Sequence, residues 1–146
     1  MPNRTHIDAL NAVLADYFAL YMKTKNFHWH VSGPHFRDFH LMLDEQAAEI
    51  IATTDLVAER VRKQGAVTLH SIGEVARLSR IKDNDKTNLD AKAMLSELQA
   101  DNLMLVASLK ELKDLVDEAK DNARGDSSYE FARVEPEMAK EKTRNV

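Results

Sequence analysis

The sequence contains no cysteine, which excludes disulfide bridges, thiolate zinc sites and a thiol nucleophile. Glycine occurs 4 times, proline 3 times, and aromatic residues make up only 6% of the chain. This scarcity of turn-forming and strand-favouring residues favours long helices. No apolar run approaches the roughly 20 residues needed to span a bilayer, and the N-terminal segment lacks the apolar core of a secretory signal. We therefore expect a cytoplasmic protein without a membrane segment.

The sequence also lacks a large excess of either charge. Its 20 Lys+Arg face 24 Asp+Glu, which gives a formal net charge of −4. A body of this sign has no general attraction for phosphate backbones. The length of 146 residues and the hydrophobic content of 44% are typical of one globular domain that buries its own core. We expect residues 1–146 to form a single domain.

Apolar residues recur at intervals of three or four in three long segments, as in amphipathic α-helices. The first segment starts near Thr5 and ends near Gly33-Pro34, where glycine can end one helix and proline can start the next. The second runs from there to Gly65, the third opens at Asn88, and residues 70–80 fit a short helix between them. The predicted stripes include Ile7, Leu10, Leu14 and Tyr17 in the first segment, Phe36, Leu43, Val57 and Val61 in the second, and Leu98, Leu105, Leu112 and Val116 in the third.

The helical pattern weakens after Gly125. The large apolar residues that remain before the end of the chain are Tyr129, Phe131, Val134 and Met138. Pro136 interrupts this segment, so a helix within residues 127–146 would be short or broken. The residues alone predict one all-α domain, organised as a helical bundle with a short helix between the second and third long segments and a short or broken helix at the end.

Histidine, carboxylate and tryptophan residues gather around the predicted turn at Pro34. His28 lies six residues before Pro34 and His40 lies six residues after it. In an antiparallel hairpin the two imidazoles would reach a similar depth and could face each other. Asp44 follows His40 by four residues and therefore shares its helix face. Trp29 is adjacent to His28 in the sequence, so an aromatic ring is expected near the same turn.

A second pair, Asp55 and Glu59, lies farther along the second predicted helix. His40 and Glu59 are 19 residues apart, or about 28 Å along a helix axis, whereas ligands approach an ion within about 2.2 Å. One straight helix therefore cannot bring both pairs to one ion. Either the pairs are unrelated, or two copies of the helix run antiparallel about a two-fold axis near Glu49-Ile50. The second arrangement predicts a metal site shared between two subunits.

Imidazole and carboxylate ligands together suit Fe(II), with Zn(II) and Mn(II) as competitors. Iron oxidation also needs open coordination positions and an electron-rich ring nearby, such as Trp29. Each residue alone has an ordinary structural interpretation: a single histidine near a helix end is usually a capping or core residue. Asp55 and Glu59 could form a solvated face, with Glu59 paired to Lys63. The combined spacing, about the turn and then about the helix midpoint, is much less expected by chance than any single position, so a metal site stands beside these structural interpretations as an alternative.

The stretch KNFHWHVSGPHFRDFHLMLDE, from Lys25 to Glu45, resembles the signature of the Dps family of ferritin-like proteins. Ala58-Glu59-Arg60 continues the resemblance, which covers about residues 5–125. It implies a four-helix bundle with a small helix between the second and third helices, assembled as a dodecamer. The implied activity is that of a ferroxidase, which oxidises Fe(II), preferentially with hydrogen peroxide. Ferric mineral would be stored inside the hollow shell, with protection against oxidative stress.

The resemblance also implies an assignment of the site residues. The implied residues are the ligands His28, His40 and Asp44 from one subunit, the ligands Asp55 and Glu59 from its two-fold mate, and the adjacent Trp29. The sequence has no glutamate followed three residues later by histidine. The di-iron motif that ordinary ferritins carry inside one bundle is therefore missing.

Two features depart from the family pattern. A lysine-rich tail is absent, because residues 1–6 carry only Arg4 as a basic side chain and residues 127–146 balance four basic against four acidic residues. Residues 127–146 also lack the aliphatic content and the closing tryptophan of the family's fourth helix. DNA binding is therefore expected to be weak. The alternatives to a ferroxidase and iron store are a non-catalytic nucleoid-associated protein that protects DNA by coating it, and a purely structural helical bundle.

Overall fold

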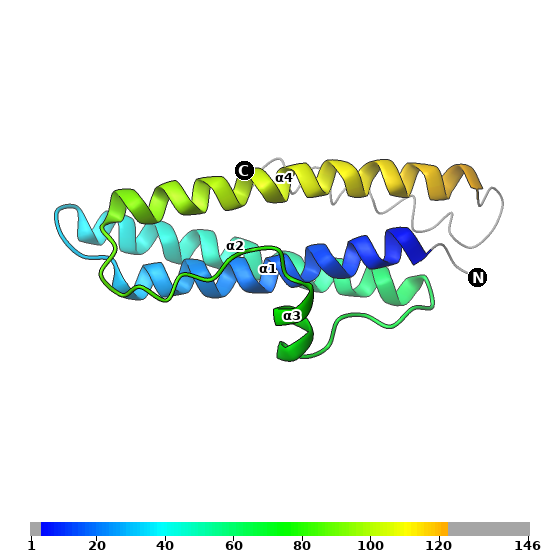
Figure 1. The fold of residues 1–146 in the computed structure, drawn as a ribbon, viewed down its shortest axis with the longest axis horizontal. Helices are drawn as coiled ribbons and strands as arrows, with labels where there is room; N and C mark the ends of the chain where they lie inside the picture. The colour runs from blue at the N-terminus through cyan, green and yellow to red at the C-terminus, as the bar shows by residue number, and fades with distance from the viewer. Residues whose placement is uncertain (1–3, 123–146) are drawn as a thin grey trace.

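The computed structural model describes residues 4–122, and these residues form four helices and no β-strand (Figure 1). Helix α1 spans Arg4–His30, α2 spans Phe36–Lys63, α3 spans Ile72–Leu78 and α4 spans Ala91–Asn122. Three long helices with a short one between the second and third confirm the prediction from the apolar periodicity. The atypical fourth bundle helix predicted in residues 127–146 lies outside the described residues. No helix within the described range is both long and apolar enough to cross a membrane.

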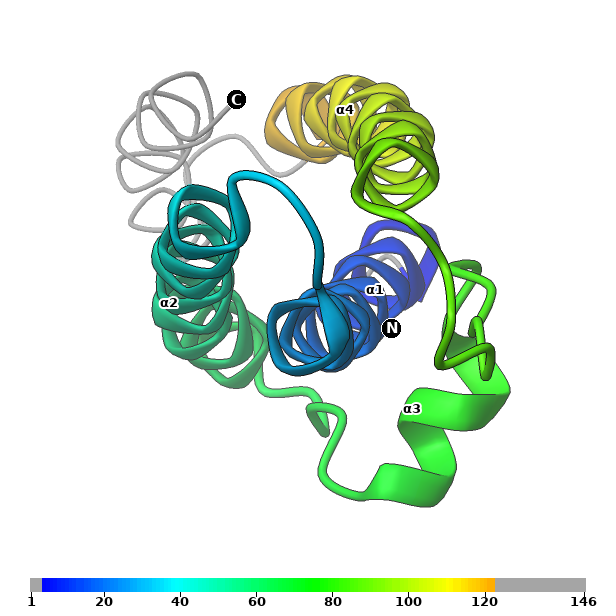
Figure 2. The same cartoon turned by 90° about the vertical axis from the view of Figure 1, so that its left-hand side faces the viewer.

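Helix α1 is central to the described part of the chain, because it contacts α2, α4 and α3. It runs antiparallel to α2, while α4 runs in the same direction as α2 (Figure 1). Viewed along the helix axes, the three long helices occupy three corners of a bundle, and α3 lies outside them beside α1 (Figure 2). The turn between α1 and α2 therefore lies at the same end of the bundle as the start of α4.

The buried side chains follow the apolar stripes that the sequence predicts. Leu10, Val13, Leu14 and Tyr17 of α1 are at most 1% exposed. Burying an apolar side chain of this size contributes about 1.5–3 kcal/mol relative to leaving it exposed. The hydrophobic core therefore lies where α1 packs against its neighbouring helices. The other long helices contribute Leu43, Val57, Val61, Met94, Leu98, Leu105, Leu112 and Val116. Phe36 differs from the prediction, since it is 44% exposed at the start of α2.

The turn between α1 and α2 is built on two residues with positive φ angles. Gly33 has a φ of 92°, a conformation that glycine adopts without steric cost and that commonly follows a helix end. His35 also lies in the left-handed region, with a φ of 62°, and immediately precedes α2. The second helix therefore begins at Phe36 rather than at Pro34.

Residues 79–90 join α3 to α4 as an extended segment along α1, which we call the strap (Figure 1). Side chains of α1 hold the strap in place. The fully buried Asp16 carboxylate accepts hydrogen bonds from the backbone N–H of Arg80 at 2.6 Å and from its guanidinium at 2.6 and 3.0 Å. Farther along α1, the Asn26 side chain donates to the carbonyl oxygen of Asn84 at 3.0 Å. The strap thus follows one path although it has no regular secondary structure.

A buried lysine links the strap to both neighbouring helices. Lys23 Nζ donates to the carbonyl oxygen of Lys82 at 2.8 Å and forms ion pairs with Glu97 at 3.1 Å and Asp101 at 2.7 Å. The Lys23 side chain is only 4% exposed. A buried charge is tolerated where opposite charges and hydrogen-bond acceptors surround it. The ammonium of Lys23 is therefore a fixed junction between α1, α4 and the strap.

Candidate metal centre

Two histidines face each other across the turn between α1 and α2. The Nδ1 atom of His28 lies 2.6 Å from the carbonyl oxygen of His40, and the Nδ1 atom of His40 lies 2.8 Å from the carbonyl oxygen of His28. The two rings are stacked, with centroids 3.8 Å apart and an angle of 17° between their planes. The structure therefore brings together the two imidazoles that the sequence places symmetrically about Pro34.

The reciprocal hydrogen bonds determine which nitrogen of each ring is protonated. A carbonyl oxygen only accepts, so Nδ1 of His28 and Nδ1 of His40 must each donate a proton. In the neutral imidazole, the Nε2 atom then carries the lone pair that can bind a metal. Metal-binding histidines characteristically donate their second ring N–H to a carbonyl or carboxylate in this manner. The pair thus presents two oriented nitrogen donors.

Asp44 adds a carboxylate one turn beyond His40 on α2. Its Oδ1 atom lies 3.9 Å from Nε2 of His28 and 2.8 Å from Nζ of Lys25. The hydrogen bond from the Lys25 ammonium lowers the pKa of the Asp44 carboxyl below its ordinary value; desolvation opposes this shift, and the charges of Lys25 and of the two histidines add to it. Asp44 is therefore an ionised oxygen donor at neutral pH.

Phe36 and Lys25 contact these donors, and Trp29 lies beside Lys25. The ring of Phe36 stacks on His40, with centroids 5.0 Å apart and an interplanar angle of 23°. Trp29 is 58% exposed at the end of α1, and Nζ of Lys25 lies 5.7 Å from its ring centroid. Sequence reasoning did not assign a role at the site to Lys25 or Phe36. The four-residue spacings from Lys25 to Trp29 and from Phe36 to His40 are the signal that could have indicated both contacts.

Asp55 and Glu59 do not join this group within one chain. Both side chains are exposed in the C-terminal half of α2. Because α2 is uninterrupted from Phe36 to Lys63, Glu59 lies about 28 Å from His40 along the axis. Among the described residues, no group of three or more histidine, aspartate or glutamate side chains could hold a metal ion. The described part of one chain therefore brings two imidazoles and one carboxylate to the same end of the bundle without forming a complete metal-binding group, and its two further carboxylates lie far away.

Comparisons with known proteins identify the family. The sequence matches the Ferritin-like domain family over residues 7–140. It is 34% identical over 117 residues to the DNA protection during starvation protein of Brevibacillus brevis, covering 80% of this chain and 78% of that one. It is also 32% identical over 125 residues to an uncharacterized low temperature-induced protein of Nostoc sp., covering 86% and 68% of the two chains. The crystal structure of a Dps protein from Bacillus brevis superposes with a TM-score of 0.77 at 29% identity, covering 97% of this chain and 93% of that one. The chain belongs to the Dps family of ferritin-like proteins.

Proposed function

We propose that this protein is a ferroxidase and iron store. It oxidises Fe(II), preferentially with hydrogen peroxide, and keeps the ferric mineral inside a hollow shell of twelve identical subunits. Its place is the cytoplasm, where consuming Fe(II) and peroxide together limits oxidative stress. Iron is the substrate and cargo of this reaction. The residues that would bind it are His28, His40 and Asp44 of one subunit with Asp55 and Glu59 of a second.

The reciprocal hydrogen bonding of His28 and His40 is the observation that carries this proposal. It orients two Nε2 lone pairs near the ionised carboxylate of Asp44. Such a donor set suits Fe(II), with Zn(II) and Mn(II) as competitors. The Asp44 side chain is 53% exposed in the single chain, so its oxygens are open to a metal ion and to residues of a second subunit. Trp29, whose ring centroid lies 5.7 Å from Nζ of Lys25, would supply the electron-rich ring near them.

The surface of α2 supports a site completed by a second copy of the chain. Ala48 and Ala52 continue the helix stripe between Asp44 and Asp55 at intervals of three and four residues, and both are exposed. Small side chains let two helices approach closely. If two copies of α2 pack antiparallel along this stripe, Asp55 and Glu59 of one copy come beside His40 of the other. The same two-fold operation completes two sites at once.

The proposed reaction balances without another reductant or cofactor. Two Fe(II) ions each give one electron to one hydrogen peroxide, whose O–O bond breaks to leave two hydroxide ions. The ferric ions then hydrolyse to mineral and release protons. In this scheme the carboxylates of Asp44, Asp55 and Glu59 offset the positive charge that rises during oxidation. The neutral imidazoles of His28 and His40 keep iron at a fixed position.

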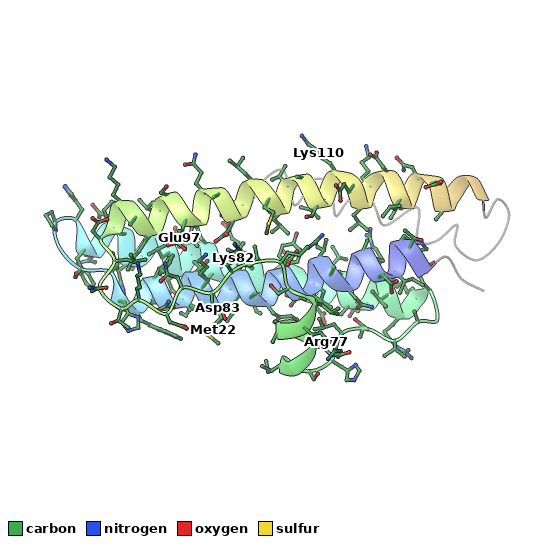
Figure 3. All side chains as sticks on the ribbon, in the orientation of Figure 1. Met22, Arg77, Lys82, Asp83, Glu97 and Lys110 are labelled. Atoms are coloured by element: carbon green, nitrogen blue, oxygen red, sulfur yellow. The ribbon has the colours of Figure 1, made fainter. Side chains whose placement is uncertain are left out.

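An anaerobic iron assay tests the proposal. Fe(II) is added to the native assembly without oxygen, hydrogen peroxide follows, and the near-ultraviolet absorbance of ferric species is recorded. The wild type should form ferric product faster with peroxide than with dissolved oxygen, while His40→Ala should be slow with both. Lys110→Ala, on the outer side of α4 (Figure 3), is the matched control and should behave like the wild type. Ferric formation no faster than in buffer alone would contradict the proposal.

A non-catalytic role in DNA protection is the second candidate. The observation that favours it is the name of the relatives from Brevibacillus brevis and Deinococcus radiodurans, which are called DNA protection during starvation proteins. The net charge of −4 weighs against it for this chain. One substitution separates the two candidate functions: His40→Ala should abolish iron oxidation and leave any binding to DNA intact.

A further inference from the structure

We propose that Lys25 competes with the metal for Asp44, so that Fe(II) gains this carboxylate only by displacing the lysine ammonium. The inference rests on the proposed function and adds a residue that sets the metal affinity of the site. Lys25 would not bind iron or react with it. It would act through Asp44, as the cation that occupies this ligand until a divalent metal replaces it.

The position of Lys25 makes it a direct competitor. Its Nζ atom donates to Oδ1 of Asp44 at 2.8 Å, and that oxygen is also the one nearest to Nε2 of His28, at 3.9 Å. A metal bound to this oxygen would lie about 2.0–2.2 Å from it. The ammonium and the metal would then be two like charges at very short range, and such charges repel strongly where water is partly excluded. Each cation therefore weakens the hold of the other on Oδ1.

The neighbouring groups stabilise the Lys25 ammonium beside Asp44, and its flexible side chain still allows it to move away. Its side chain is 19% exposed, against 53% for Asp44, so the ammonium is better shielded than the carboxylate that it pairs with. The ring of Trp29, 5.7 Å from Nζ, adds a second weak attraction. A lysine ammonium is a compact charge on a flexible four-carbon stem. It can therefore swing away from Asp44 without any movement of the α1 backbone.

The ion pair would also stabilise the site before metal arrives. In the two-subunit arrangement, Asp55 and Glu59 of the second copy approach Asp44, and three carboxylates in one crevice repel one another. The charge of Lys25 offsets part of this repulsion. Removing that charge should raise the attraction for divalent cations and weaken the metal-free pair of subunits. The two effects have opposite signs, so metal affinity and metal-free stability can be measured as separate consequences of one substitution.

Titration of the native assembly with Co(II) under argon tests the inference without any turnover. Co(II) is a divalent probe for imidazole and carboxylate ligands, and its visible absorbance reports binding. Lys25→Met removes the charge and keeps most of the side-chain length, so it should bind Co(II) about three- to tenfold more tightly than the wild type. Lys25→Arg keeps the charge and should bind no more tightly than the wild type. Lys110→Met, on the outer side of α4 (Figure 3), should leave the affinity unchanged.

A double-mutant cycle with Asp44→Asn separates competition at Asp44 from a general charge effect. If Lys25 acts through Asp44, Lys25→Met should change the Co(II) affinity by less than about twofold in the Asp44→Asn background. An equal gain in both backgrounds would overturn the inference. If Lys25→Met fails to assemble, Lys25→Gln gives the same comparison.

The outcomes distinguish this inference from the proposed function. Co(II) binding that His40→Ala abolishes and Lys25→Met leaves unchanged would overturn only the role of Lys25. Absence of Co(II) binding in the wild type and in Lys25→Met alike would overturn the metal site and this inference with it. Tighter binding in Lys25→Met that disappears in the Asp44→Asn background would support both.

Discussion

His28 and His40 each donate a ring N–H to the backbone carbonyl of the other, so two helices share one pair of hydrogen bonds at 2.6 and 2.8 Å. Neither imidazole can turn about its ring axis without losing its bond to the opposite helix. The orientation of the donors and the closure of the turn between α1 and α2 are therefore one structural unit. One chain supplies His28, His40 and Asp44 to the proposed site, and a second chain would supply Asp55 and Glu59.

Complementation between two inactive variants should reveal whether the site is shared. His40→Ala and Glu59→Ala should each be nearly inactive as pure assemblies. In a mixed two-fold pair one site receives both defects, and the other receives an intact His40 and an intact Glu59. Random pairing at equal amounts makes about half of the pairs mixed, so refolding the variants together should restore up to roughly a quarter of the wild-type ferroxidase rate.

A second mixture serves as the control for complementation. His40→Ala and Asp44→Ala alter the same half of the site, so every site in their mixed pairs keeps one defect. This mixture should remain as inactive as its parents. Mass spectrometry of the intact assemblies verifies that both mixtures contain both chains. If the mixture with Glu59→Ala recovers no more activity than the control, the two-chain site is wrong.

Arg80→Ala should destabilise the protein, because it removes the guanidinium that pairs with the fully buried Asp16. Asp16 would keep its backbone donor but would carry a charge that is poorly compensated. We expect a loss of about 2–4 kcal/mol in the free energy of unfolding. Arg77→Ala is the matched control, since Arg77 lies on α3 and is 3.8 Å from Glu74 at the surface.

The control should change stability by no more than about 0.5 kcal/mol. Urea unfolding at one fixed protein concentration measures both variants, because the stability of an oligomer depends on concentration. An equal loss in the free energy of unfolding for Arg80→Ala and Arg77→Ala would show that the ion pair between Arg80 and Asp16 does not stabilise the fold.

The helices were predictable from the sequence because their apolar residues repeat with the helical period. Gly33 and Gly65 also marked the ends of α1 and α2 correctly, since both have positive φ angles. The predicted start of α4 was less accurate, since the helix begins at Ala91 rather than at Asn88. The carboxylate of Asp90 accepts a hydrogen bond from the backbone N–H of Ala93 at 2.8 Å and so caps the helix. The apolar periodicity does not tell which of two nearby cap residues, Asn88 or Asp90, starts the helix.

Contacts between distant side chains were not predictable in the same way. The path of the strap depends on side chains of α1 that lie 58 to 64 residues away in the sequence. No local pattern in residues 79–90 records these contacts. Lys25 was missed for a similar reason: its partner Asp44 lies on another helix, 19 residues later. The juxtaposition of His28 and His40 was accessible because a single short turn determines it.

Acidification should destabilise the protein through His6. Burial lowers the pKa of this imidazole below its ordinary value, while a hydrogen bond with Gln64 opposes the shift. The unfolded chain therefore binds the proton more readily than the folded one. The contribution of His6 to stability is complete above the ordinary pKa of about 6.5 and is lost as the pH falls through the window between the two pKa values.

The free energy of unfolding at about pH 7.5 and about pH 5.5 checks this prediction. The wild type should lose more stability over this interval than His6→Gln, because glutamine at position 6 does not titrate. Comparing the two proteins removes the contribution of the other histidines. An identical pH dependence in both would show that the titration of His6 does not affect folding.

DNA binding should be weak at physiological salt. Affinity for duplex DNA comes mainly from clustered cations that release counterions, whereas this chain has a net charge of −4 and only Arg4 as a basic side chain in residues 1–6. A gel-shift experiment at about 150 mM salt without divalent ions should show little retained DNA. Chelator must be present, because bridging Mg²⁺ would mask the result. Tight retention under these conditions would contradict the prediction.

The strap has a consequence for which positions can change during evolution. Lys23 and Asn26 donate to the carbonyl oxygens of Lys82 and Asn84, and every residue type carries such an oxygen. Where only that oxygen is used, as at Lys82, the strap can accept other side chains and keep its path. The donors on α1 cannot be exchanged so freely, because alanine at position 23 or 26 would offer no donor. Substitution of Lys23 or Asn26 in α1 would thus disorder the strap between α3 and α4, roughly 60 residues later in the sequence.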